Sequence, residues 1–177
     1  HVRPYVRRNK TDRADAAGIP IHAEMSSVNP VFLLPGALRE RGAVLAQEFF
    51  ASCTMGSGQF CTNPGIVLVP QGVDGDAFVA LAAEKFDAAA PMVLFSQGVQ
   101  QHLAHAMQAL RAAGARVVSG KAQADGPGTR YAPTLLAVDG DAFLANTDAL
   151  QQEAFGPVSL LVRYRDEDEA AAIARAF

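Results

Sequence analysis

Apolar side chains recur about once per helical turn along three stretches of this chain. This spacing predicts amphipathic helices over residues 39–52, 76–89 and 99–113. The third stretch has the clearest pattern, with apolar positions at Val99, Leu103, Met107 and Leu110. A further helix is expected to start with residues 166–169, because four consecutive acidic side chains suit the positive end of a helix dipole.

Short, largely apolar runs alternate with these helices and predict strands. They cover residues 31–34, 66–69, 116–119, 134–138 and 158–164. Runs without polar alternation are typical of strands that are buried on both faces. Strands that alternate with helices indicate an α/β fold, with a parallel or mixed sheet flanked by helices.

One break between predicted elements carries candidate chemistry. The octapeptide Gly-Gln-Phe-Cys-Thr-Asn-Pro-Gly, residues 58–65, lies between the first helix and the strand at 66–69. Its glycines let a substrate approach the backbone closely. A thiol at such a break, here Cys61, can be partly exposed and act as a nucleophile once it is ionised. From the spacing alone, a buried apolar cysteine is an equally good interpretation.

The same octapeptide resembles the nucleophile motif of the aldehyde dehydrogenase superfamily, Gly-Gln-x-Cys-x-x-Pro-Gly. Two further stretches resemble family motifs in the right order, residues 23–30 before it and residues 152–157 after it. The Met-Ser-Ser that follows Glu24, together with Phe60 and Asn63, is similar to the branch that oxidises 2-oxoglutarate semialdehyde. The resemblance implies an incomplete aldehyde dehydrogenase catalytic domain of α/β class.

The resemblance also implies roles for individual residues in an oxidation of an aldehyde to a carboxylate by NAD or NADP. Cys61 would attack the aldehyde carbonyl as a thiolate, and Glu24 would activate the water that hydrolyses the thioester. Glu153 would bind the nicotinamide ribose, and Phe155 would pack near the ring. The family usually has a glutamate where this chain has Gln152. Without the resemblance, Glu24 is better explained as a surface or capping carboxylate.

The resemblance covers residues 19–177, which is well under half of a full-length family member. Residues 1–18 are expected to form a basic leader outside the fold, and they cannot hold the dinucleotide-binding domain that precedes these motifs in the family. A stretch of this leader, Lys-Thr-Asp-x-x-Asp-Ala at residues 10–16, resembles insertion-sequence transposases that hold divalent metal with a DEDD carboxylate set. A chance basic sequence is the alternative. We expect weak or no activity from the chain alone. The resemblance also implies homo-oligomers, which complete family members form.

The amino-acid composition argues against several other classes of protein. Half of the residues are hydrophobic and 19% are charged, as in a globular protein. No apolar run reaches the roughly 18 residues of a membrane span, and residues 1–17 show no signal-peptide pattern. The two cysteines suit a reducing cytoplasm, and Cys53 is expected in the core. The pair His102 and His105 could share a metal, but with no acidic or thiol ligand nearby in sequence we expect solvated side chains and no metal site.

Charge is distributed unevenly along the chain. The formal net charge is −3, although residues 1–13 carry five basic side chains and one acidic one. The rest is therefore acidic, which argues against nucleic-acid binding by the body of the protein and leaves only a basic arm at residues 1–17 as a candidate. A second alternative is a non-catalytic remnant or gene-fusion product that only folds or associates with other subunits.

Overall fold

The structure is a computed structural model that describes residues 28–120 and 127–177. The predicted basic leader, residues 1–18, and the candidate base Glu24 lie outside the described residues. The boundary at residue 19 therefore stays a prediction.

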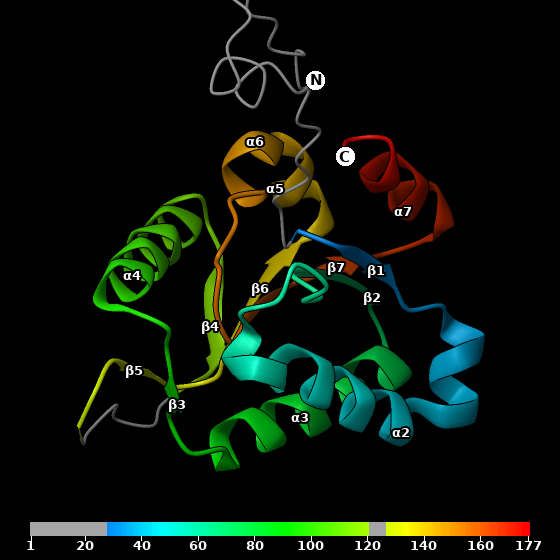
Figure 1. Cartoon of the computed structure of the whole chain (residues 1–177). Helices are drawn as coiled ribbons and strands as arrows, with labels where there is room; N and C mark the ends of the chain where they lie inside the picture. The colour runs from blue at the N-terminus through cyan, green and yellow to red at the C-terminus, as the bar shows by residue number, and fades with distance from the viewer. Residues whose placement is uncertain (1–27, 121–126) are drawn as a thin grey trace, which may run out of the picture.

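A five-stranded mixed sheet forms the centre of the protein (Figure 1). Its strand order is β1 (Pro30–Phe32), β2 (Ile66–Pro70), β7 (Val158–Tyr164), β6 (Thr134–Asp139) and β4 (Arg116–Ser119). The first four strands run parallel to one another, and β4 is antiparallel to β6. The prediction of an α/β fold with a mixed sheet is confirmed. Two short antiparallel strands, β3 (Met92–Val93) and β5 (Arg130–Tyr131), form a separate ribbon.

Helices cover both faces of this sheet (Figure 1). The helices α2 (Pro35–Thr54) and α3 (Val73–Ala88) pack on one face. The other face is covered by α4 (Gln97–Ala112), α5 (Gly140–Ala145), α6 (Thr147–Leu150) and α7 (Glu167–Ala174). The helices predicted from periodicity correspond to α2, α3 and α4, and the helix predicted from its acidic start corresponds to α7. The helices α5 and α6 are too short to show a period.

Successive side chains of the central strands contribute alternately to two hydrophobic cores, one on each face of the sheet. In β2, Val67 and Val69 contribute to the core under α2 and α3, while Ile66 and Leu68 contribute to the core under α4. Successive side chains of a strand point to opposite faces, so a strand covered on both faces needs apolar residues throughout. Every residue of β2 and β7 is buried, as their largely apolar sequences predict.

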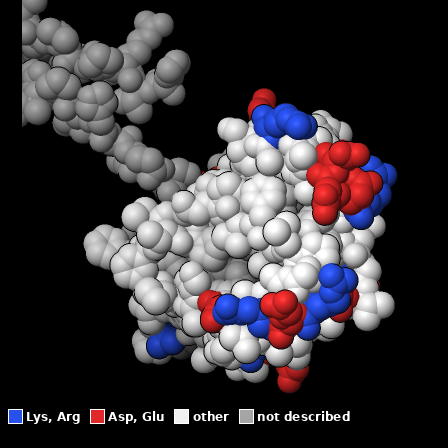
Figure 2. Space-filling view, turned by 90° about the vertical axis from the view of Figure 1, so that its right-hand side faces the viewer, with Lys and Arg blue, Asp and Glu red and all other residues white. Residues whose placement is uncertain are grey.

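The first strand departs from its sequence pattern. All three residues of β1 are exposed, and Val31 and Phe32 each retain 38% of their accessible surface. The prediction of a buried strand was wrong because β1 is the edge strand of the described sheet, with β2 as its neighbour on one side. Figure 2 shows this side of the molecule, where charged residues gather at the margins around an uncharged middle.

The length and apolar character of the described helices decide whether any of them could cross a membrane. None of those within residues 28–120 and 127–177 combines the length and apolar character that crossing a bilayer requires.

Candidate active site

Cys61 lies in the connection between α2 and β2, on a loop that starts with an unusual turn. The short 3₁₀ helix η1 (Met55–Gly58) follows α2 directly. Gly56, Ser57 and Gly58 all have positive φ angles, of 55°, 60° and 69°. Such backbone conformations are easy for glycine and rare for serine. The turn reverses the chain at the end of α2 and leaves Cys61 exposed.

This loop is fixed against the third family motif. A side-chain carbon added at Gly58 would collide with the carbonyl group of Gly156 and the nitrogen of Pro157. Asn63 is only 2% exposed, and its Nδ2 atom donates a hydrogen bond of 3.1 Å to the carbonyl oxygen of Gly156. The loop at residues 58–65 and the turn at Gly156 therefore form one unit, although they are about 90 residues apart in the sequence.

Side chains from two other segments secure the backbone at Cys61 and in the three residues after it. The Nδ2 atom of Asn29 donates to the carbonyl oxygens of Cys61, at 2.6 Å, and of Asn63, at 2.8 Å. The hydroxyl of Ser159 in β7 donates to the carbonyl oxygen of Pro64 at 2.7 Å. Sequence reasoning missed these roles, and the only signal was that Asn29 and Asn63 each precede a proline, as turn-forming residues often do.

Gln59 ties the same loop to the segment after β3. Its Oε1 atom accepts a hydrogen bond of 2.7 Å from the backbone N–H of Phe95. Its Nε2 atom donates to the carbonyl oxygens of Gly56, at 3.2 Å, and Val93, at 3.4 Å. Before Cys61, Gly58 is thus held by backbone packing and Gln59 by side-chain hydrogen bonds.

The two cysteines have opposite environments. Cys53, on α2, is fully buried, as predicted for a core residue. Burial raises the pKa of its thiol well above the ordinary range, and a hydrogen bond involving Ser159 offsets only part of this effect. Cys61 is a free and exposed thiol. Exposure makes Cys61 the better candidate for a nucleophile, because a thiol that stays protonated and buried cannot attack a substrate.

Glu153 and Phe155 lie together at an open pocket of about 550 Å³. Both side chains are partly buried. Gln152 and four residues of α4 complete the lining, and those four are His102, His105, Ala106 and Ala109. Cys61 does not line this pocket. The structure therefore brings the two candidate cofactor residues together and links their segment to Cys61 through the turn at Gly156.

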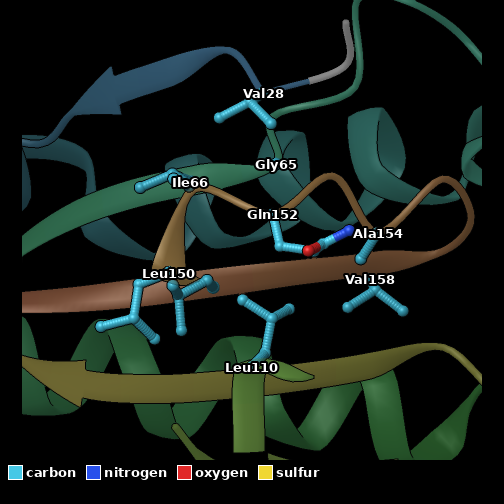
Figure 3. A pocket seen from close by; sticks show the side chains of 9 residues that line it. Val28, Gly65, Ile66, Leu110, Leu150, Gln152, Ala154 and Val158 are labelled. Carbon is cyan, nitrogen blue, oxygen red and sulfur yellow. The ribbon is translucent and has the colours of Figure 1, made fainter. Parts of the chain in front are cut away.

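The segment that carries Glu153 rests on the core with little empty space beneath it. Figure 3 shows the small cavity between this segment, β2 and α4, with Gln152 and Ala154 on its rim. Its volume is about 10 Å³, about the smallest that holds one water molecule. Apolar side chains of Val28, Ile66, Leu110 and Val158 close most of it. A segment seated on such a floor has little freedom to move inwards.

Within residues 28–120 and 127–177, no group of three or more histidine, cysteine, aspartate or glutamate side chains could hold a metal ion. His102 and His105 are exposed on α4.

Comparison with known proteins identifies the family. The sequence profile of the aldehyde dehydrogenase family matches residues 6–176. The alpha-ketoglutaric semialdehyde dehydrogenase 2 of Azospirillum brasilense is 42% identical over 159 residues, which are 89% of this chain and 30% of that protein. The alpha-ketoglutaric semialdehyde dehydrogenase of Acinetobacter baylyi is 36% identical over 84% of this chain and 28% of its own length. The chain thus spans about 30% of these relatives.

Solved structures support the fold. Aldehyde dehydrogenase C from Pseudomonas syringae, a variant in complex with NAD+ and octanal, superposes with a TM-score of 0.74 at 23% identity, over 93% of this chain and 35% of that one. Betaine aldehyde dehydrogenase from Staphylococcus aureus, in complex with NAD+, gives a TM-score of 0.73 at 20% identity, over 92% and 34%. With the profile match over nearly its whole length, this chain belongs to the aldehyde dehydrogenase family.

Proposed function

We propose that this chain carries the nucleophile and the nicotinamide-side contacts of an NAD(P)-dependent aldehyde oxidation, with Cys61 as the nucleophile. The observation that carries the proposal is the attachment of the Cys61 loop to the Gly156 turn by Asn63. This attachment holds an exposed thiol in a constant relation to the segment of Glu153 and Phe155. Covalent catalysis requires such fixed geometry between the nucleophile and the acceptor of the hydride.

The chemistry follows from the properties of the two candidate catalytic groups. The Cys61 sulfur, as a thiolate, attacks the aldehyde carbonyl carbon and forms a thiohemiacetal. The backbone N–H of Cys61 is a candidate donor to the oxyanion that develops. Glu153 and Phe155 would hold NAD or NADP, which would supply the acceptor for the hydride that leaves the thiohemiacetal as it becomes a thioester. Glu24 then takes a proton from the water that hydrolyses the thioester and releases the carboxylate.

The pocket at Glu153 and Phe155 fits part of a dinucleotide. Its volume of about 550 Å³ falls in the range of about 300–1,000 Å³ that is usual for small-molecule sites. The Glu153 carboxylate can accept hydrogen bonds from ribose hydroxyls, and the Phe155 ring can pack against a planar heterocycle.

The two curated relatives named above support 2-oxoglutarate (alpha-ketoglutaric) semialdehyde as the substrate. Because the chain spans about 30% of their length, we propose weak or absent turnover by the chain alone. Assembly into homo-oligomers, as in complete family members, is part of the same proposal.

Alkylation of Cys61 tests the nucleophile. Iodoacetamide should modify Cys61 in the folded chain, and 2-oxoglutarate semialdehyde should slow this reaction by forming the reversible thiohemiacetal. 2-Oxoglutarate is the matched control, because its carboxylate replaces the aldehyde and cannot form that adduct. Alkylation sites are read by peptide mass spectrometry, with Cys61→Ser as the blank. Equal alkylation rates with and without the semialdehyde would refute the proposal and favour a non-catalytic remnant.

A further inference from the structure

A long stretch in the middle of the chain contains no acidic residue. All 18 aspartate and glutamate residues lie outside residues 88–124, although the chain as a whole carries a formal net charge of −3. Arg111 and Arg116 belong to this stretch. Its charge is therefore opposite in sign to that of the whole chain, and such a surface attracts anions.

The fold places both arginines in one open pocket of about 710 Å³. Arg111 lies in the last turn of α4, Arg116 is the first residue of β4, and Tyr131 is the last residue of β5. The pocket lies where these three elements meet (Figure 1). None of the nine described residues that line it is acidic. The pocket thus combines two guanidinium groups with no carboxylate to neutralise them.

This pocket is separate from the one at Glu153. The two pockets share no lining residue. On α4, the lining of the Glu153 pocket starts at His102, whereas the lining of this pocket starts at Ala104. Two positions correspond to a rotation of about 200° around a helix, so the two pockets lie on different sides of α4. A ligand in this pocket would not contact the candidate cofactor residues.

The polar groups of the pocket are available to a ligand. Within residues 28–120 and 127–177, the three ion pairs all involve other arginines, so neither Arg111 nor Arg116 has a carboxylate partner there. Tyr131 is half-buried and packs against the core. Burial raises the pKa of its hydroxyl, and the positive charge of Arg111 offsets part of this effect. The hydroxyl therefore stays protonated at neutral pH and can donate a hydrogen bond near the guanidinium group.

We propose that this pocket binds a small organic dicarboxylate, with one carboxylate on each arginine. A guanidinium group matches a carboxylate with two parallel hydrogen bonds, so two arginines suit a ligand with two carboxylates. The apolar side chains of Met107, Ala115 and Val117 also line the pocket and suit the carbon chain between the two charges. The inference does not depend on the proposed function, because no residue of the candidate active site lines this pocket.

Glutarate and valerate test the inference at equal ionic strength, because these five-carbon chains carry two carboxylates and one. The chain contains three tyrosines, so the ring signals of Tyr131 in ¹H–¹³C NMR spectra can be assigned with Tyr131→Phe. We expect glutarate to shift these signals and valerate to bind about tenfold more weakly. Arg111→Gln/Arg116→Gln should also bind glutarate about tenfold more weakly. Both arginines are exposed, so this variant should fold, which circular dichroism checks.

A matched control removes two positive charges elsewhere. Arg39 and Arg175 are exposed and lie outside the pocket, so Arg39→Gln/Arg175→Gln should bind glutarate like the wild-type chain. An equal loss of affinity in the two double variants would show attraction by overall charge and overturn the inference.

The choice of ligand can also contradict the inference. It is wrong if valerate or inorganic phosphate shifts the Tyr131 signals at the same concentrations as glutarate, because the pocket then does not recognise two carboxylates. It is equally wrong if glutarate leaves these signals unchanged at high millimolar concentration. Neither result involves Cys61 or NAD(P), so failure here leaves the proposed function untouched.

Discussion

The close contact between Gly58 and the Gly156 turn can be tested by adding a single methyl group. In Gly58→Ala the new Cβ atom would occupy the position of the Gly156 carbonyl and the Pro157 nitrogen, which are backbone atoms that cannot rotate away. Gly58 also has a φ angle of 69°, in the left-handed region that disfavours side chains with a Cβ atom. The substitution therefore combines a steric and a conformational penalty at the same residue.

The expected loss in the free energy of unfolding is the sum of these two penalties. A left-handed conformation costs a non-glycine residue about 1–2 kcal/mol. Overpacking in a well-packed region costs about 1–3 kcal/mol more. We therefore expect Gly58→Ala to lower the free energy of unfolding by about 2–5 kcal/mol, unless the loop moves away from the turn. If the loop does move, Cys61 moves with it, and its rate of alkylation changes.

Two other glycines provide matched controls. Gly114 has a φ angle of 107° and open space around its Cβ position, so Gly114→Ala should carry only the conformational cost of about 1–3 kcal/mol. Gly42 lies within α2 with open space and no positive φ, so alanine there should stabilise the helix by about 0.5–1 kcal/mol. Neither control should change Cys61 alkylation.

The assay is urea unfolding followed by far-UV circular dichroism, since the chain contains no tryptophan, together with iodoacetamide alkylation of the folded proteins. If Gly58→Ala is as stable as Gly42→Ala and Cys61 reacts at the wild-type rate, the close approach of the loop to the Gly156 turn does not exist. Cys61 would then not be held in place by the Gly156 turn.

Two further predictions concern Cys53 and Asn63. Because burial raises the pKa of the Cys53 thiol, the native chain keeps a proton that the unfolded chain loses above about pH 8.5, and the free energy of unfolding should fall by up to about 1.4 kcal/mol per pH unit there. In urea titrations between pH 7 and pH 9.5, the free energy of unfolding should fall less steeply with pH in Cys53→Ala than in the wild-type chain. An identical dependence on pH in the two proteins would contradict the burial of the Cys53 thiol. Asn63→Ala leaves the Gly156 carbonyl without its side-chain donor and should cost about 1–3 kcal/mol while changing Cys61 alkylation. Thr62→Ala, at an exposed position of the same loop, should change stability by less than about 0.5 kcal/mol, and equal effects of the two variants would speak against the role of Asn63.

Burial of the central strands and helix periodicity were readable from the sequence. The prediction of a strand over residues 158–164 matches β7 residue for residue, and the helical period at Leu103, Met107 and Leu110 marks the buried face of α4. Both features depend on local alternation of side chains, which a strand or helix imposes whatever its neighbours are. The burial of Cys53 was foreseen in the same way. The family resemblance, carried by short motifs, pointed to Cys61, Glu153 and Phe155, while Glu24 lies outside the described residues.

Features that depend on which segments become neighbours required the tertiary structure. The exposure of β1 follows from its edge position, which its apolar sequence does not reveal. The hydrogen bond from Asn63 to Gly156 and the pocket shared by His102 and Glu153 join residues that are distant in the chain. Local patterns encode backbone conformation and average burial, whereas contacts between distant residues are set by strand order and by the packing of helices on the sheet. The nucleophile motif was therefore recognisable in the sequence, but its attachment to the third motif was decided by the fold.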